Sequence, residues 1–406
     1  MAIRELEFTA LPETLEARPS DVAALVLIRL RGRPVGQALL PLETGRCTGL
    51  RARLLAAADS AFWEAWLAED LGLPPAPRPA PAPAATIAVC TRDRPEDLER
   101  CIAALLALPD DGQEIIIVDN APRTEATRDL VARFPQIRYL REPRPGLDVA
   151  RNRALSEART ELVAFTDDDA APDPMWLRAL LRNFDDPLVM AATGPTLPLE
   201  LDCQAQIDFQ HYGGFLRGYK RMLLDAAVTD PFLGWHAGAG VNMALRRTVI
   251  DQVGLFDDAL DAGTKTRAGG DADMFRRMLA AGYRIAHDPE ALNWHRHRRS
   301  LKELGEQLHG YEVAGGAVLA KAMFHEGNWG AGLRFMLWLR GELTLVAARL
   351  LRRGGSPLAV SRTRIAGGFI GLRAYGIARR IADGQQRAET APRSGPVPGP
   401  VTGKDR

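Results

Sequence analysis

Three consecutive aspartates, Asp167, Asp168 and Asp169, follow the apolar run Leu162–Phe165. Neighbouring carboxylates repel one another, so some positive partner must hold the three together. Mg²⁺ or Mn²⁺ would serve, because hard divalent cations prefer carboxylate oxygens and commonly join them to substrate phosphates. A solvated acidic turn is the alternative, and the local sequence leaves both interpretations open.

A fourth aspartate, Asp271, stands in the segment "AGGDADMFRRMLAAGYRI". The apolar residues that follow it have helical spacing, so Asp271 falls at a predicted helix start, where aspartate often caps the backbone. A carboxylate on a glycine-rich approach is also suited to take a proton from a hydroxyl group as a general base. The two roles are compatible.

Other polar residues give weaker signals. Asp119 follows an apolar strand pattern and could accept hydrogen bonds from a base or a ribose, although a turn is the simpler interpretation. His295 and His297 have the spacing of a zinc pair, but no third ligand is near in sequence, which favours a basic surface turn. Gly238 and Gly240 lack a preceding strand and a third glycine, so they do not form a Rossmann fingerprint.

The elements that must position these residues alternate between apolar strands and amphipathic helices, which indicates a parallel sheet covered on both faces. Ligands of such sheets bind outside the carboxyl ends of the strands. Three predicted strands end in polar residues, so these residues should gather at one edge of the sheet. The polar ends are Thr91–Arg92, Asp119–Asn120 and Thr166–Asp169.

The chain divides at a proline- and alanine-rich stretch, residues 74–84, which predicts a stiff linker. Residues 1–73 form a small unit with strand and helix patterns and no chemical motif, and residues 85–310 form the main body. Residues 311–384 are predicted to be helical and basic, and 385–406 to be disordered. The predicted fold class is α/β, a mostly parallel sheet flanked by helices, with a small N-terminal α+β unit and a helical C-terminal region.

The net charge of +1 argues against a nucleic-acid partner, but the charge is uneven. Residues 331–380 hold ten arginines and a single acidic residue, Glu342, while the chain before them is acidic. This region is interpreted either as a peripheral membrane contact or as a helical cover with a solvated arginine-rich face. In the membrane interpretation, four aromatic residues would lie at the interface: Trp329, Phe335, Trp338 and Tyr375.

The four cysteines form no CxxC pair, which fits a reducing compartment. The first residues lack the pattern of a signal peptide. We therefore expect a cytoplasmic protein, working at the inner face of the cell membrane if the membrane interpretation holds.

Taken in order, the motifs of residues 85–310 resemble the family 2 glycosyltransferases with a GT-A (Rossmann-like) fold. Each motif is weak alone, and the ordered set is specific. The resemblance rests on "IAVCTRDRPEDLERCIAAL", "EIIIVDNAP", "PGLDVARNRAL", "LVAFTDDD", "GAGVNMALRR", "GLFDDALDAGT", "GGDADMFRRMLAAGYRI" and "NWH".

The resemblance implies a role for each matching position. It implies Asp271 as the catalytic base, Asp169 and Asp167 as metal ligands, and His295 as a histidine that approaches the metal or the diphosphate. It implies that the nucleotide part of the donor is held by Thr91, Arg92, Asp119, Arg151 and Asn152, with Asp168 beside them in the aspartate motif. Two positions depart from the family pattern: Gly270 stands where a glutamate is frequent, and Asp148 where a serine is frequent.

The implied activity is an inverting, metal-dependent glycosyltransferase of hexosyl type. It would use Mg²⁺ or Mn²⁺ and move a sugar from a UDP-, GDP- or dTDP-sugar to a hydroxyl of a glycan or a lipid-linked cell-envelope precursor. Two alternatives stay open. A nucleotidyltransferase would need a glycine-rich loop after the first strand, which "TRDRPEDLE" lacks. A non-catalytic sugar-nucleotide-binding scaffold would bind the donor without turnover.

Overall fold

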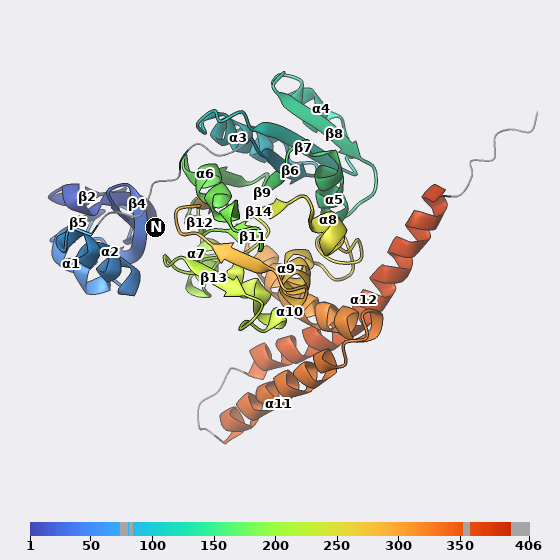
Figure 1. The fold of residues 1–406 in the computed structure, drawn as a ribbon. Coiled ribbons are helices and arrows are strands. Elements are labelled where there is room, and N and C mark those ends of the chain that lie inside the picture. Colours follow the sequence, from blue (N-terminus) through green and yellow to red (C-terminus); the bar gives the residue numbers. More distant parts are fainter. Residues whose placement is uncertain (74–79, 81–83, 352–357, 391–406) are drawn as a thin grey trace, which may run out of the picture.

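The structure, a computed structural model, describes residues 1–73, 80, 84–351 and 358–390. Most of the predicted linker and residues 391–406 lie outside this range. The N-terminal unit, the sheet-bearing body and the C-terminal helices are distinct regions in space (Figure 1).

The N-terminal unit is α+β, with a three-stranded sheet in the order β1-β3-β4 and a small β2-β5 pair. Strands β3 and β4 are antiparallel around a tight turn, where Arg31 and Gly32 both have positive φ. Its elements are β1 (Ala2–Glu7), η1 (Phe8–Ala10), β2 (Thr14–Glu16), β3 (Ala23–Leu30), β4 (Arg33–Pro41), β5 (Arg46–Thr48), α1 (Leu50–Ala57) and α2 (Ser60–Asp70).

This unit packs against the body. Leu27 and Ala61 join Leu197 and Leu292 in one buried apolar cluster. Arg29 also reaches across and donates to Asp173 at 2.5 Å. The unit is therefore attached to the body through both apolar and charged contacts.

The body is built on an eight-stranded sheet with the order β13-β15-β11-β14-β9-β6-β7-β8. The four predicted strands β6 to β9 are present and mutually parallel, while β14 runs antiparallel between β9 and β11. The strands are β6 (Thr86–Thr91), β7 (Glu114–Asn120), β8 (Ile137–Glu142), β9 (Leu162–Asp167), β11 (Val189–Thr193), β13 (Met222–Asp225), β14 (Asn242–Arg246) and β15 (Arg284–His287).

Helices cover both faces of this sheet, which confirms the predicted α/β class. Leu98 of α3 and Trp176 of α6 are in the apolar cluster of one face, and Leu155 of α5 and Phe275 of α9 are in that of the other. The helical elements of the body are α3 (Pro95–Leu106), α4 (Ala126–Val131), α5 (Leu147–Glu157), α6 (Trp176–Leu181), η2 (Arg182–Asp185), α7 (Gln204–His211), η3 (Pro231–Ala237), α8 (Val249–Gln252) and α9 (Gly270–Ala280).

A second, three-stranded sheet lies beyond the end of β9. It consists of β10 (Ala170–Pro172), β16 (Asn293–His295) and β12 (Thr196–Pro198), in the order β10-β16-β12. Because Ala170 pairs with His295 across β10 and β16, the histidine is placed beside the three aspartates.

The C-terminal region consists of α10 (Leu301–Ala320), a π-helical turn (Lys321–His325), α11 (Gly330–Leu350) and α12 (Leu358–Thr390), which continues past the expected boundary at 384. The backbones of α10 and α12 touch, since a Cβ on Gly316 would lie 2.1 Å from the carbonyl oxygen of Gly368. The hairpin formed by α11 and the first part of α12 projects from the body (Figure 1). None of the described helices is both long enough and apolar enough to cross a membrane.

Candidate active site

Polar residues end three neighbouring strands at the same edge of the sheet. Thr91 at the end of β6 pairs with Asp119 of β7 on one side, and Cys90 pairs with Asp167 of β9 on the other. Because these strands are parallel, their carboxyl ends share one edge, where open α/β sheets bind ligands. The predicted gathering of Thr91, Asp119 and Asp167 is thus a direct result of the strand register.

Asp167, Asp169 and His295 form a compact group of donors at this edge. One ligand atom from each lies within 4.8 Å of those of the other two. Two carboxylates and an imidazole are a donor set that suits a divalent cation, so the residues present fit the Mg²⁺ or Mn²⁺ expected from the sequence.

The protein itself also supplies positive charge to the aspartates. The guanidinium of Arg94 lies 2.8 Å from Asp169 and 3.1 Å from Asp168, and Nε2 of His295 lies 3.0 Å from Asp169. Burial would raise the pKa of Asp169, but His295 and Arg94 outweigh it and hold the pKa well below its usual range. Arg94 was not predicted, although its position just after the first strand was a usable signal.

Asp168 differs from its two neighbours. Its side chain is buried, accepts a hydrogen bond from Thr91 Oγ1 at 2.7 Å and faces Arg94 rather than His295. Burial raises its pKa despite that arginine. Asp168 and Thr91 therefore brace the loop that presents Asp167 and Asp169.

Asp119, near the end of the neighbouring strand β7, has only one of its two carboxylate oxygens hydrogen-bonded to a described residue. Its side chain is fully buried, and one carboxylate oxygen accepts from the Tyr139 hydroxyl at 2.8 Å. The other oxygen has no hydrogen-bond partner among the described residues. A buried acceptor without a donor is unfavourable until a ligand supplies one. Arg92 remains half exposed nearby, with Nε 3.9 Å from Asp93.

Asp271 lies at the start of α9, as predicted. Its carboxylate accepts from the backbone N–H of Gly240 and of Ala272, both at 2.7 Å. Burial, together with the nearby carboxylate of Asp261, raises the pKa of Asp271. A raised pKa brings a carboxylate closer to the strength a general base needs near neutral pH.

Arg151 connects Asp271 with the aspartate cluster. It donates to Asp148 at 3.0 Å and to Asp261 at 2.7 Å, and it lies within electrostatic range of both Asp271 and Asp167. A Cβ on Gly240 would lie 2.4 Å from its guanidinium. A side chain at this position would displace the guanidinium of Arg151, whereas glycine leaves room for it beside the backbone N–H that bonds Asp271.

The two departures from the family pattern meet in space. A Cβ on Gly270 would lie only 2.0 Å from a carboxylate oxygen of Asp148, so Asp148 fills the room that a side chain at position 270 would need. Asp148 is fully buried, and one of its oxygens has no hydrogen-bond partner within the described part of the chain. Sequence alone could not show that these residues, far apart along the chain, adjust to one another.

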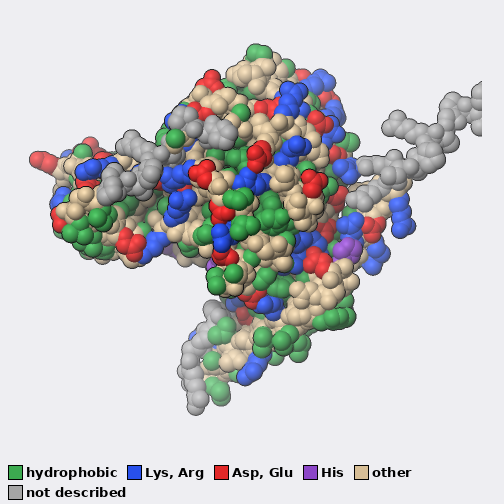
Figure 2. All heavy atoms as spheres, in the orientation of Figure 1, with side chains coloured by type: hydrophobic (Ala, Val, Ile, Leu, Met, Phe, Trp, Pro, Cys, Tyr) green, Lys and Arg blue, Asp and Glu red, His purple; other side chains and the backbone are tan. Residues whose placement is uncertain are grey.

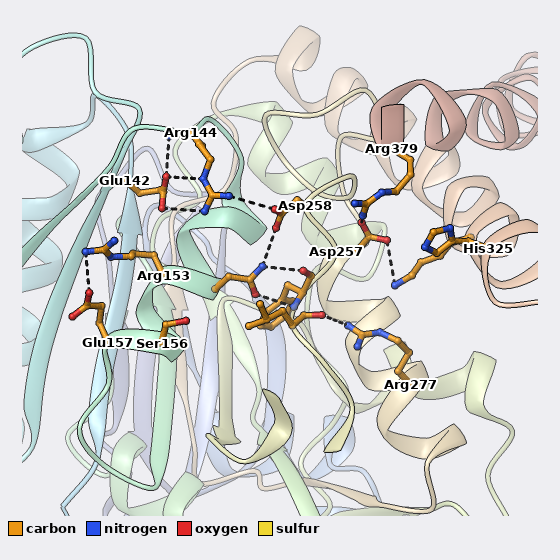
Figure 3. Close-up of a pocket in the computed structure, with 14 residues that line it drawn as sticks. Glu142, Arg144, Arg153, Ser156, Glu157, Asp257, Asp258, Arg277, His325 and Arg379 are labelled. Carbon is orange, nitrogen blue, oxygen red and sulfur yellow. Dashed lines mark hydrogen bonds and ion pairs between the residues drawn. The ribbon is translucent and has the colours of Figure 1, made fainter. Parts of the chain in front are cut away.

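Asn152 is not brought to the cluster. Its amide holds the loop after α8, with hydrogen bonds to the backbone of Phe256 and to Asp258, all at 2.9 Å. It lines a separate cavity of about 490 Å³ between α5, this loop, α9 and the C-terminal helices. In Figure 3, the charged residues around that cavity point toward one another in pairs, such as Arg144 with Glu142 and Arg153 with Glu157. Asn152 therefore supports the fold behind Arg151.

Fold and site together define an α/β protein with a carboxylate cluster at the carboxyl edge of its central sheet. Comparison with known proteins gives the family. The model described as Glycosyl transferase family 2 matches residues 86–225, and that of Glycosyl transferase family group 2 matches residues 162–308. The chain belongs to the family 2 glycosyltransferases.

Curated relatives match a little over half of the chain. The Pre-mycofactocin glycosyltransferase of Mycobacterium tuberculosis is 26% identical over 234 residues, covering 57% of this chain and 46% of the relative. The Succinoglycan biosynthesis protein ExoM of Rhizobium meliloti is 28% identical over 265 residues, covering 58% of this chain and 80% of the relative. The chain thus spans about half the length of the first of these relatives.

Two solved structures are similar to this chain at lower sequence identity. One is the mannosyltransferase PcManGT from Pyrobaculum calidifontis, in complex with GDP-Man and Mn²⁺, with a TM-score of 0.45, 20% identity and coverage of 83% of this chain and 84% of that one. The other is S. aureus TarS, with a TM-score of 0.43, 12% identity and coverage of 59% and 40%.

Proposed function

We propose that this chain is an inverting glycosyltransferase of hexosyl type, which moves a sugar from a nucleoside diphosphate sugar to the hydroxyl of a glycan or a lipid-linked cell-envelope precursor. The observation that carries the proposal is the compact group of Asp167, Asp169 and His295 at the carboxyl edge of the sheet, whose ligand atoms lie within 4.8 Å of one another. A diphosphate-binding cluster of this kind, together with the carboxylate of Asp271 held by backbone N–H groups at the start of α9, suits a displacement at an anomeric carbon.

In this proposal the nucleotide lies along the ends of β6 and β7. The unpaired carboxylate oxygen of Asp119 accepts a hydrogen bond from the ribose or the base, and Arg92 lies at the open side. The diphosphate lies over Asp167, Asp169 and His295. A divalent cation held by these three residues would neutralise the charge that develops on the leaving diphosphate.

Asp271 acts on the acceptor. Its carboxylate takes the proton from the attacking hydroxyl, which then adds to the anomeric carbon from the face opposite the leaving group, so the configuration inverts. The two backbone N–H groups from Gly240 and Ala272 fix the carboxylate. The charge of the nearby Arg151 favours the ionised form of this carboxylate.

The two relatives, a Pre-mycofactocin glycosyltransferase and a Succinoglycan biosynthesis protein, support glycosyl transfer as the reaction of this chain.

The test is a screen of UDP-, GDP- and dTDP-sugars with Mg²⁺ or Mn²⁺, in which released nucleotide is measured with and without a chelator. We expect release with one donor, loss of release in chelator, and recovery when the metal is restored. Asp169→Asn should reduce turnover at a fixed metal concentration by at least about 10- to 100-fold, since even indirect disturbance of a metal site costs that much. Exposed Asp129→Asn on α4 is the matched control and should leave turnover unchanged.

Three outcomes would contradict the proposal. Donor binding without turnover for every acceptor would indicate a scaffold. Release of pyrophosphate from a nucleoside triphosphate would indicate a nucleotidyltransferase. A product that retains the anomeric configuration in a proton NMR spectrum would exclude direct displacement with Asp271 as base.

A further inference from the structure

The outward face of α11 is apolar. Trp329, Leu333 and Met336 expose 71%, 63% and 61% of their surface, and Leu343 and Leu350 are also exposed. Their spacing of three, four or seven residues places them along one side of the helix. In Figure 2, green side chains lie along the projecting hairpin.

The opposite side of α11 packs against α12. The ring of Phe335 lies 5.2 Å from that of Phe369 on α12, Trp338 packs against Gly368, and Glu342 is buried with Arg364. The exposed stripe therefore lies on a different side of α11 from the residues that pack against the rest of the protein. Soluble proteins rarely leave such a contiguous apolar stripe uncovered unless something binds it.

The charges near this stripe are positive and unpaired. Arg340 lies within the stripe, and Arg362, Arg373 and Arg380 occupy the exposed side of α12, where Phe369, Ile370, Ile377 and Ile381 are also exposed. None of these four arginines forms an ion pair with another described residue. Two acidic residues of α11 and α12 have described side chains, and both are already engaged: Glu342 pairs with Arg364, and Asp383 with Arg379.

We propose that the apolar stripe of α11, together with the arginine-bearing outer side of α12, docks on an anionic lipid bilayer. Leucine and methionine side chains would enter the boundary between headgroups and acyl chains, with Trp329 at the interface. The arginines would meet lipid phosphates, each strengthening the binding by roughly fivefold. The proposal goes beyond glycosyl transfer and does not depend on it.

A second copy of the chain is the less suitable occupant. A two-fold contact would place the same surface on both sides, so Arg340 and its neighbours would face their own counterparts. A bilayer rich in anionic lipid instead offers an apolar interior for the exposed side chains of the stripe and negative headgroups for its arginines.

The full-length protein is tested by flotation with two kinds of vesicle, phosphatidylcholine alone and phosphatidylcholine mixed with phosphatidylglycerol. We expect flotation with the anionic vesicles at low salt, a strong reduction at high salt, where charge is screened, and little binding to phosphatidylcholine alone. The triple variant Leu333→Gln, Met336→Gln, Leu343→Gln should lower the bound fraction at least about tenfold.

The control variant Leu223→Gln, Val228→Gln removes exposed apolar residues of the body and should float like the original protein. The variant Arg373→Gln, Arg380→Gln tests the charge separately and should weaken binding by roughly 25-fold. Thermal unfolding and light scattering accompany every variant.

Absence of flotation with anionic vesicles at low salt would overturn the proposal. It would equally be overturned if the folded triple variant floated like the original protein. A dimer in solution that the triple variant disperses, without vesicle binding, would assign the stripe to a second copy instead.

Discussion

Charged side chains are paired at the edge of the central sheet, whereas on the outer side of α11 and α12 four arginines are exposed and form no ion pair with another described residue. At the sheet edge, Asp169 and Asp148 are buried and Asp271 is partly buried, and each is balanced by an arginine, a histidine or backbone N–H groups. On the C-terminal helices, Arg362 and Arg373 remain in solvent with no ion pair to any described residue.

The difference shows what each region is organised to do. Burying a carboxylate is unfavourable unless it is paired, so a buried and balanced cluster indicates positions fixed in advance for chemistry. Exposed arginines without an ion pair neither stabilise nor destabilise the fold appreciably. We therefore infer that these arginines interact with a partner outside the chain, and the exposed apolar stripe beside them points to such a partner as well.

The largest expected effect is at Asp271. Replacing it with asparagine keeps the shape but removes the proposed base, so turnover should fall by about 10²- to 10⁴-fold. Donor affinity should stay nearly constant, because the proposed role of Asp271 is on the acceptor. Steady-state kinetics with separate measurement of donor binding checks this, and unchanged turnover would refute the assignment.

The pH profile sharpens the same prediction. Burial raises the pKa of Asp271, and the base works only when ionised, so kcat/KM of the original enzyme should rise with pH through a value above that of an ordinary aspartate. Folding also loses stability as pH rises through this window, because the folded protein holds the proton more tightly than the unfolded chain. Asp271→Asn should lack both the activity limb and this loss of stability.

A smaller effect is expected at Gly270. A methyl group there would meet the carboxylate of Asp148, so Gly270→Ala should lower the free energy of unfolding by about 1–3 kcal/mol. The matched control is Gly305→Ala on α10, where a Cβ would meet no atom within 4 Å, and we expect a gain of about 0.5–1 kcal/mol. Denaturant unfolding measures both, and equal values for the two variants would show that Asp148 moves aside freely.

Much of this organisation could be predicted from the sequence. The apolar runs that form β6 to β9 predicted the parallel core. The polar residues that end three of these strands predicted the edge where Thr91, Asp119 and Asp167 meet. Local patterns suffice here, because parallel strands bring their carboxyl ends together whatever else the chain does.

The rest depends on contacts between distant residues. No local pattern shows that Asp148 occupies the space beside Gly270, that Tyr139 satisfies one oxygen of Asp119, or that β14 enters the sheet antiparallel. The family resemblance implies that Asn152, like Arg151, lies near the nucleotide. Adjacent residues on a helix point in different directions, and the side-chain amide of Asn152 donates to the backbone of Phe256.

The smallest effect is expected at Arg373, and its size tests the comparison of the two regions directly. Arg373 is exposed and has no charged partner in the described part of the chain, so Arg373→Gln should change the free energy of unfolding by no more than about 0.5 kcal/mol. Lys321, by contrast, is buried between Asp257 and Asp273, and Lys321→Gln removes one charge of the same sign at a cost of about 3–5 kcal/mol. Denaturant unfolding of the two variants side by side is the measurement. A loss at Arg373 close to that at Lys321 would mean that the outer arginines already stabilise the fold, and the reason for seeking their partner outside the chain would disappear.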